Sequence, residues 1–296
     1  MKTNFVETEK NVVGNWYEVE LIHEEKSEYQ TVKIFRNEVF GKMLVIDDLL
    51  QSSTRYEHIF NEMLVHGALT CCEKPEKILI IGGASCNTLK QVMKYSGVQS
   101  VTICDIDRSV FEICKKFIPE YIEGTEEFFR SGKAKFVFRD AGEFLKECCA
   151  EKKKFDAIIL DGTDPVGAGE NLYSREMFKL CAEQVGDSGI VATHVNNPLI
   201  YPENYEKVLS AMSDELNFIR PAYCAEPEFP GAMYTFLYAG KKILEIYPHE
   251  GAKGKYFNPE LFIGAQMLPT FLLKIFEHAG LEKISSVPGA CYRKNS

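Results

Sequence analysis

The chain has 296 residues, of which 45% are apolar, so it can bury one large hydrophobic core or one core with a small satellite. Its net charge of −9 makes nucleic acid and anionic membranes poor partners and favours a cationic small molecule. Met1 to Asn15 lack the apolar segment of a signal peptide, and no run of about 18 apolar residues predicts a membrane span. We therefore expect a cytoplasmic protein without a membrane partner.

The 10 cysteines and 6 histidines do not form clusters with metal-ligand spacing. We interpret the cysteines as reduced thiols, mostly buried as small apolar groups, and we predict no metal site. Cys86 stands apart because it directly precedes a predicted helix, where the pKa of a thiol can fall. A packing role for Cys86 is the simpler interpretation.

Residues 1–68 are expected to form an N-terminal antiparallel β domain. Strand-like patterning covers residues 16–22, 30–35 and 43–47, and residues 37–42 supply turn chemistry before the last of these. A helix is expected to begin near Arg55, because Ile59, Met63 and His66 fall on one helical face.

Residues 69–296 are expected to form a second domain in which strands alternate with helices. The predicted strands cover residues 77–81, 100–105, 135–139, 155–160, 189–193 and 232–239. A closing helix is predicted over 269–279, with Pro269 in its first turn. Repeated strand–helix units give a parallel, doubly wound α/β sheet that binds its ligand at the carboxyl ends of the strands.

A glycine turn follows the first strand of this domain. Gly82 and Gly83 let the backbone approach a ligand, and the helical segment after them begins near residue 88. Asp105 ends the next strand, close to the ~20-residue spacing at which nucleotide-binding folds place a ribose-binding carboxylate. The combination predicts a nucleoside site, and the alternative is a tight turn beside a solvated acid.

Carboxylates recur where the predicted strands end. They are Asp105, Asp140 and Asp161, with Asp164 three residues further on. Helix capping is the alternative that suits Asp140, which precedes A-G-E. Capping does not account for three acids at one edge, so we expect them to surround a nucleoside and a cationic group beside it.

The segment from Leu160 to Tyr173, L-D-G-T-D-P-V-G-A-G-E-N-L-Y, closely resembles the D-S-[ST]-D-P-[VIM]-G-P-A-[EK]-x-L-[FY] segment of the spermidine synthases, the polyamine aminopropyltransferases. Further matches lie at 27–30, 40–47, 51–66 in part, and 256–260. The resemblance covers nearly the whole chain. It implies a Rossmann-like, class I methyltransferase-type parallel sheet with a small N-terminal antiparallel β domain, usually in homodimers or homotetramers.

In this family, decarboxylated S-adenosylmethionine donates an aminopropyl group to an amine or polyamine acceptor. An ammonium ion has no lone pair, so the acceptor must first lose a proton, which a neighbouring carboxylate can accept. By resemblance, Asp161 is that base and Asp164 holds the acceptor's amine. The resemblance assigns donor contacts to Gln30, Gly82, Gly83, Ser85, Asp105 (ribose), Asp140 (adenine amino group) and Ala141, and acceptor contacts to Gln51, Phe60, Asn61 and Phe229.

The chain departs from the family at the donor tail. The family's loop G-G-G-D-G-G is here G-G-A-S-C-N, from Gly82 to Asn87, and the missing acid falls at Ser85. In the family, that acid binds the amine of the donor's aminopropyl tail. It would repel the carboxylate of intact S-adenosylmethionine, so Ser85 removes the attraction and the repulsion together.

The acceptor pocket departs as well. Phe60 and Phe229 stand where the family has tyrosines, and Asn61 replaces a glutamine. Asn196 lies near the position of an acceptor-binding glutamate. Glu226 and Glu228 are new acids beside Phe229, which either grip a different amine or are solvated loop acids.

Three functions remain open on these residues. The first is aminopropyl transfer to an amine acceptor with altered donor-tail and acceptor pockets. The second is methyl or aminocarboxypropyl transfer from intact S-adenosylmethionine on the same fold. The third is a catalytically degenerate paralogue that binds a nucleoside, which the retained acids argue against, because a binding-only protein has little use for the base.

Overall fold

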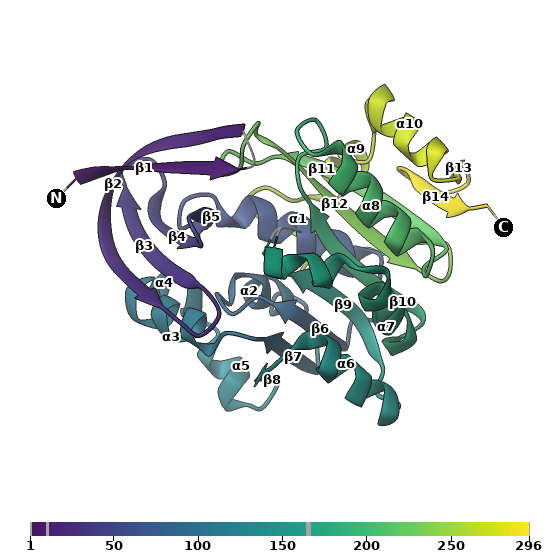
Figure 1. The fold of residues 1–296 in the computed structure, drawn as a ribbon. Coiled ribbons are helices and arrows are strands. Elements are labelled where there is room, and N and C mark those ends of the chain that lie inside the picture. The colour runs from purple at the N-terminus through teal and green to yellow at the C-terminus, as the bar shows by residue number, and fades with distance from the viewer. Residues whose placement is uncertain (1, 10–11, 164–166, 296) are drawn as a thin grey trace.

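The computed structural model describes residues 2–9, 12–163 and 167–295. Figure 1 shows a small sheet near the N-terminus and a larger sheet flanked by helices, with the two chain ends on opposite sides of the molecule. The strands of the small sheet are β1 (Lys2–Glu9), β2 (Val12–Lys26), β3 (Thr31–Asn37), β4 (Gly41–Ile46) and β5 (Leu49–Ser53). They pair in sequence order, each antiparallel to the next, which confirms the predicted meander and adds strands at both of its edges.

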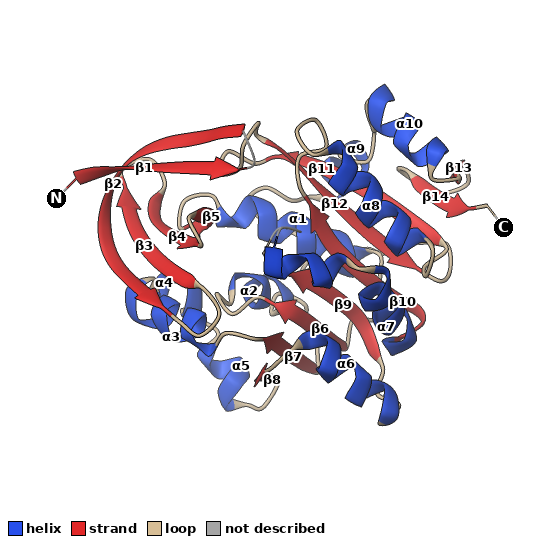
Figure 2. Ribbon diagram, in the orientation of Figure 1, coloured by secondary structure: helices blue, strands red, loops and turns tan. Residues whose placement is uncertain are grey.

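The larger sheet mixes a parallel half with an antiparallel half (Figure 2). Its parallel strands are β6 (Lys77–Gly82), β7 (Ser100–Asp105), β8 (Ala134–Phe138), β9 (Phe155–Asp161) and β10 (Val185–Val195). Its antiparallel strands are β11 (Phe218–Ala225), β12 (Met233–Gly240), β13 (Leu281–Ile284) and β14 (Cys291–Lys294). The strand order is β13-β14-β11-β12-β10-β9-β6-β7-β8, so the parallel half has the predicted doubly wound character.

Helices cover both faces of the larger sheet. They are α1 (Glu57–Thr70), α2 (Asn87–Val92), α3 (Arg108–Phe117), α4 (Pro119–Ile122), α5 (Glu126–Arg130), α6 (Ala141–Ala150), α7 (Arg175–Gln184), α8 (Pro202–Ser213), α9 (Pro259–Gly264) and α10 (Thr270–His278), with a 3-10 helix at Gly167–Tyr173. Side chains alternate along a strand, and Ile78 and Ile80 of β6 therefore pack into the core beneath α1, α2 and α3, whereas Leu79 and Ile81 pack into the core beneath α6, α7 and α8. Burial on both faces explains why β6 is a continuous apolar run.

Two local predictions need correction. Pro269 is the N-cap of α10 and not part of its first turn. The strand predicted over 189–193 begins earlier, because β10 starts to pair with β9 at Val185. No described helix combines the length and the apolarity that a membrane crossing requires.

The register of β6 places the predicted site residues at one edge. Gly82 is the partner of Asp161 at the end of β9, and β7 runs parallel to β6 on its other side and ends at Asp105. The glycine turn therefore leaves the sheet between two acids.

The small sheet closes over this edge (Figure 1). Ser27 Oγ lies 2.6 Å from Asp107 Oδ2, and Gln30 Nε2 donates to the same oxygen at 3.0 Å. These bonds tie the β2–β3 turn to the N-cap of α3. The division after residue 68 stays a prediction, and the packing of α1 on β9, β10, β11 and β12 favours a boundary before that helix.

Candidate active site

A cavity of about 580 Å³ opens at the carboxyl ends of the parallel strands. It brings together every described residue that the sequence assigned to the donor or the acceptor, namely Gln30, Gln51, Phe60, Asn61, Gly82, Gly83, Ser85, Asp105, Asp140, Ala141, Asp161 and Phe229. Asp164, the predicted acceptor-binding acid, lies outside the described residues.

The lining of the cavity is acidic. Among the described residues that line it, the carboxylates are Asp47, Asp105, Asp140 and Asp161, and the one side chain with a permanent positive charge is Arg139. The two terminal nitrogens of the Arg139 guanidinium, Nη1 and Nη2, each donate to the Glu147 carboxylate at 2.7 Å, so the charge of Arg139 is already paired. A cationic ligand suits this lining better than an anionic one.

The glycine turn can only be built from glycine. Gly82 and Gly83 have φ of 82° and 75°, in the left-handed region that L side chains rarely adopt. A Cβ on Gly82 would collide with the Asp161 carbonyl oxygen, and one on Gly83 would lie 2.8 Å from Ile80 Cγ2 and 3.1 Å from Asp161 Oδ2. The Gly83 N–H donates to the Asp161 carbonyl at 3.0 Å. The two glycines therefore set the backbone position of Asp161.

Asp105 is held by the backbone on both of its oxygens. Oδ2 accepts from Ala84 N at 3.1 Å, and Oδ1 accepts from Asp107 N at 2.9 Å. Burial raises the pKa of Asp105 to about 6, although the backbone N–H groups oppose the shift. Its two oxygens thus stand at the cavity wall, where the sequence places the ribose.

Asp161 is the most perturbed of the strand-end acids. Burial raises the pKa of this carboxyl to about 7, a hydrogen bond donated by Thr88 would oppose the rise, and the Asp105 carboxylate adds to it. Its Oδ2 is within hydrogen-bond distance of Thr88 Oγ1, at the start of α2. A carboxyl with a pKa near neutrality can both take up and release a proton at physiological pH.

His194 holds the loop that follows Asp161. Its Nε2 lies 2.8 Å from the Gly162 carbonyl oxygen, which can only accept, so the proton sits on Nε2. Nδ1 then accepts from the Tyr234 hydroxyl at 2.9 Å. Burial lowers the pKa of His194 to about 4, so the ring is neutral. The Tyr173 hydroxyl donates to the Thr163 carbonyl at 3.0 Å and fixes the loop one residue further along.

Asp140 combines the two roles that the sequence weighed. Its side chain caps α6 by accepting from Glu143 N at 2.9 Å, and it also lines the cavity next to Ala141. Capping occupies Oδ1, which leaves its other oxygen for a ligand.

Aromatic rings line the part of the cavity that the resemblance assigns to the acceptor. Phe60 packs edge-on against Phe229 at 6.0 Å between ring centroids and against His194 at 5.1 Å. Tyr234 lies 4.5 Å from Phe229. The wall is therefore apolar at the two positions where tyrosines were expected by resemblance, and it suits the alkyl chain of an amine.

Glu226 and Glu228 are buried, so their interpretation as solvated loop acids is wrong. Glu226 accepts from the backbone N–H groups of Glu228 and Phe60, and Glu228 from the hydroxyl and N–H of Ser53. Burial raises the pKa of Glu226 to about 8 and that of Glu228 well above its ordinary value. Neither residue lines the cavity.

Cys86 is a packing residue. It is buried with φ of 70°, and burial raises the pKa of its thiol, so the fall that a helix N-terminus can cause is absent. Asn196 is buried and does not line the cavity. Among the described residues, no group of three or more His, Cys, Asp and Glu side chains has a geometry that could hold a metal ion.

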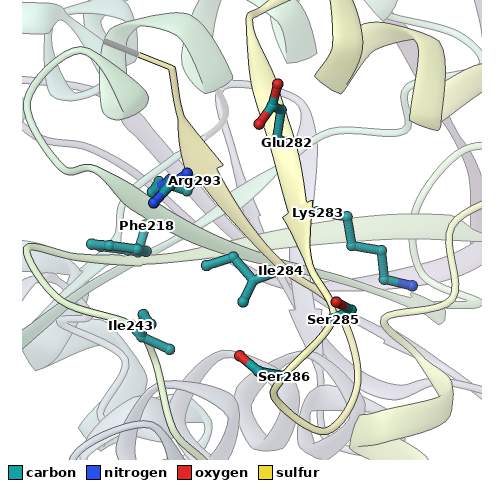
Figure 3. Close-up of a pocket in the computed structure, with 8 residues that line it drawn as sticks. All are labelled: Phe218, Ile243, Glu282, Lys283, Ile284, Ser285, Ser286 and Arg293. Atoms are coloured by element: carbon teal, nitrogen blue, oxygen red, sulfur yellow. The ribbon is translucent and has the colours of Figure 1, made fainter.

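A second hollow of about 270 Å³ lies at the far edge of the large sheet, between β11, β13 and the loop after β13 (Figure 3). Its lining includes Phe218, Ile243, Glu282, Lys283 and Arg293. It has no glycine turn and mixes both signs of charge, so it does not match the nucleoside site that the sequence predicts.

Sequence reasoning missed four polar residues of the site. Thr88, His194, Tyr173 and Tyr234 hold Asp161 and the loop behind it. Tyr173 ends the segment that carried the resemblance, and Thr88 lies at the junction between the glycine turn and the helix. The sequence therefore held a signal that could have identified both residues. His194 and Tyr234 reach the site only through the pairing of β10 with β12.

Comparisons with known proteins agree with this geometry. Residues 57–247 match the spermine/spermidine synthase domain, and residues 5–53 match the spermidine synthase tetramerisation domain, which supports an oligomer. The chain is 31% identical to a spermidine synthase from Schizosaccharomyces pombe, with 86% of each chain covered. It is 29% identical to a polyamine aminopropyltransferase from Pectobacterium atrosepticum, covering 90% of this chain and 94% of the relative.

Solved structures share the fold. A spermidine synthase in complex with the transition-state analogue AdoDATO superposes with a TM-score of 0.85, at 24% identity, over 93% of this chain and 95% of the other. The spermidine synthase from Thermotoga maritima superposes with a TM-score of 0.83, at 24% identity, over 93% and 94%. The glycine turn, the acidic strand ends and the matched domains lead to one conclusion: the chain belongs to the spermidine synthase family and is an aminopropyltransferase of that family.

Proposed function

We propose that this protein transfers an aminopropyl group from decarboxylated S-adenosylmethionine to an amine, with Asp161 as the general base. The observation that carries the proposal is the position of Asp161, a buried carboxyl with a pKa of about 7 at the wall of an acidic cavity beside the glycine turn. A base whose pKa lies near the working pH takes a proton efficiently and releases it again.

The donor is proposed to lie over the glycine turn. Gly82 and Gly83 give it close backbone approach, Asp105 receives the ribose hydroxyls, and Asp140 with Ala141 receives the adenine. Gln30 contacts the donor from the small sheet, anchored by Asp107. The sulfonium is a cation, and the acids around the cavity suit it.

The reaction is proposed to run as an in-line displacement. Asp161 takes a proton from the acceptor's ammonium, and the freed nitrogen lone pair attacks the aminopropyl carbon next to sulfur. The carbon–sulfur bond breaks, its electrons stay on sulfur, and a neutral thioether leaves. Because a sulfonium is already a good leaving group, holding the two reactants in line supplies much of the acceleration.

The acceptor is proposed to extend along Phe60 and Phe229, with polar contacts from Gln51 and Asp164. Asn61 lines the same space, but its amide already bonds within the protein. We therefore assign Asn61 to the support of the site and not to direct acceptor binding.

Intact S-adenosylmethionine is the second candidate donor, and Ser85 is the observation that favours it. Ser85 removes the acid that would repel the tail carboxylate of this donor. Against it stands the rest of the lining, where the one permanent cation, Arg139, among the described residues is already paired. A buried carboxylate without a partner is costly, so we rank the decarboxylated donor first.

The oligomer is proposed to be a homodimer or a homotetramer. Residues 5–53 match a tetramerisation domain, and they form the small sheet that closes over the site. The bonds from Ser27 and Gln30 to Asp107 would couple the order of that sheet to the donor site.

The test is the replacement of Asp161 by asparagine. Asp161→Asn should keep donor binding, measured by calorimetry, and lower kcat for aminopropyl transfer across α,ω-diamines at least ~100-fold, the loss typical of a missing general base. Asp187→Asn, at an exposed position, serves as the matched control. Turnover unchanged in Asp161→Asn would remove Asp161 from the mechanism. Donor binding without turnover in the wild-type protein would indicate the degenerate paralogue.

A further inference from the structure

A chain of hydrogen bonds runs from Asp161 into helix α1. Thr88 Oγ1 lies within hydrogen-bond distance of Asp161 Oδ2 and 2.9 Å from Asn61 Oδ1. Asn61 Nδ2 in turn lies 2.7 Å from the Glu57 carbonyl oxygen and 3.2 Å from Glu57 Oε2. Thr88 and Asn61 are both buried, and Asn61 also lines the cavity.

The orientation of the Asn61 amide is fixed by the backbone. The Glu57 carbonyl oxygen can only accept a hydrogen bond, so the NH₂ group of Asn61 must face it. The amide oxygen therefore faces Thr88. This assignment holds whether or not the Glu57 carboxyl is protonated, because the carbonyl alone decides it.

The Thr88 hydroxyl has one proton and two neighbours. Asn61 Oδ1 carries no hydrogen, so the contact between it and Thr88 exists only if Thr88 donates. The same proton cannot also go to Asp161. If the proton goes to Asn61, Thr88 presents a lone pair to Asp161 Oδ2, and a hydrogen bond there takes its proton from the carboxyl; if it goes to an ionised Asp161, the contact with Asn61 is left without a hydrogen bond.

We propose that Asn61 is a positioning residue that draws the Thr88 proton away from Asp161, so that Thr88 accepts a hydrogen bond from a protonated Asp161 in the empty site. The inference rests on the proposed role of Asp161 as the base. It gives Thr88 and Asn61 a function in the reaction, although neither exchanges a proton with the substrate.

The groups that face this chain do not reverse the assignment. Asp105, at the end of β7, faces Asp161 and opposes a second negative charge there, and His194 of β10 is neutral. Around Glu57 stand Lys90, Lys94, Glu62 and Lys255, whose charges act on the far end of the chain. The empty cavity therefore disfavours the ionised form of Asp161, and a cation that enters it would favour that form.

The arrangement makes the base responsive to the donor. A sulfonium beside Asp161 favours its ionised form, so binding of the donor releases the proton and prepares the carboxylate for the acceptor. When kcat/KM is plotted against pH, the fall on the acid side reports the pKa values of groups in the free enzyme. The corresponding fall in kcat, its acid limb, reports the pKa values of groups in the bound complex. The limb should therefore lie at lower pH for kcat than for kcat/KM.

The experiment compares the acid limbs of kcat/KM for the donor, with the best α,ω-diamine acceptor of a three- to six-carbon panel held well below saturation, so that the free enzyme is reported. Amines titrate near pH 10, well above this limb. Asn61→Leu frees the Thr88 proton to bond the Asp161 carboxylate, which favours the ionised form. The midpoint of the acid limb of kcat/KM should therefore fall by about one to two pH units, even if the maximum value of kcat/KM also changes. Glu57→Gln is the control, because it keeps the backbone carbonyl that orients Asn61, and its limb should not move.

Thr88→Val decides the direction of the hydrogen bond. It should not raise the limb, and Asn61→Leu should produce no shift in the Thr88→Val background, because its effect passes through the hydroxyl. A raised limb in Thr88→Val, or an Asn61→Leu shift that persists without the hydroxyl, would overturn the inference. So would an unshifted limb in a folded Asn61→Leu. If Asp161→Asn keeps full turnover, the proposed function itself fails, which is a different result.

Discussion

At the scale of single residues, the fold places Asp161 in an environment that changes its acidity. Three features act on this one carboxyl: the glycine turn that sets its backbone, the hydroxyl of Thr88 at Oδ2, and the burial that raises its pKa to about 7. None of these is a property of an aspartate in isolation. Thr88, which contacts its carboxyl, lies 73 positions away along the chain.

Gly83→Ala tests the glycine turn. The added Cβ would lie 3.1 Å from Asp161 Oδ2 at a φ of 75°, so it should both strain the backbone and displace the carboxyl. We expect kcat for aminopropyl transfer to fall about 10–100-fold, the usual cost of a misplaced reacting group. Steady-state kinetics measure this directly. Gly97→Ala is the matched control, because nothing lies within 4 Å of its Cβ, and equal losses in the two variants would contradict the role of Gly83.

The identity of the site residues was largely predictable from the sequence, and their partners were not. Gly82, Asp105 and Asp161 are recognisable because strand ends meet at one edge in a parallel sheet. Asn61 was expected to bind the acceptor, but the structure shows its amide bonded to Thr88 and Glu57. Such a hydrogen bond depends on side-chain distances, which no sequence pattern specifies.

At the scale of elements, hydrophobic patterning predicts the strands that are buried on both faces or that alternate regularly between apolar and polar residues. β11 was missed because Pro221 lies inside it and a proline argues against a strand interior. The structure accommodates Pro221 because β14 pairs with β11 only at Phe218 and Ile219. The four-residue strands β13 and β14 are too short to give a periodic signal.

The loop between β11 and β12 carries a prediction about stability. The pKa of Glu226 is raised from 4.5 to about 8, and Glu228 beside it is raised well above its ordinary value. The native protein therefore holds these protons more tightly than the unfolded chain does. Stability from this pair is present below the unfolded pKa near 4.5 and is lost as pH rises towards and through about 8.

Glu228→Gln should remove part of the stability loss that the buried glutamates cause at high pH. A neutral amide can still accept from Ser53 and carries no charge to bury, so we expect a gain of about 1 kcal/mol at pH 8, which corresponds to about 2–4 °C in Tm. Thermal unfolding at pH 5 and pH 8 measures it, and the gain should be smaller at pH 5. The exposed Glu282→Gln serves as a control. A variant that is less stable at pH 8 would show that Glu228 is needed as a carboxylate.

At the scale of the whole molecule, the two sheets contribute different parts of the candidate site. The larger sheet supplies the glycine turn and the acidic edge, and the small sheet covers that edge and matches a tetramerisation domain. The chain's net charge of −9 already favoured a cationic ligand, and the cavity concentrates this preference in a lining where the single permanent cation among the described residues is paired. The composition and the cavity thus favour the same sign of charge in a ligand, and only the fold shows where such a ligand would bind.

The measurement that tests the central claim most directly is calorimetric titration of decarboxylated and intact S-adenosylmethionine, side by side, into the wild-type protein and Ser85→Asp. An acidic cavity in which the described lining offers only a paired cation predicts tighter binding of the decarboxylated donor to the wild type. Ser85→Asp should widen that preference by at least about tenfold, because an added carboxylate attracts the tail amine and repels the tail carboxylate. Tighter binding of intact S-adenosylmethionine to the wild type would contradict the account.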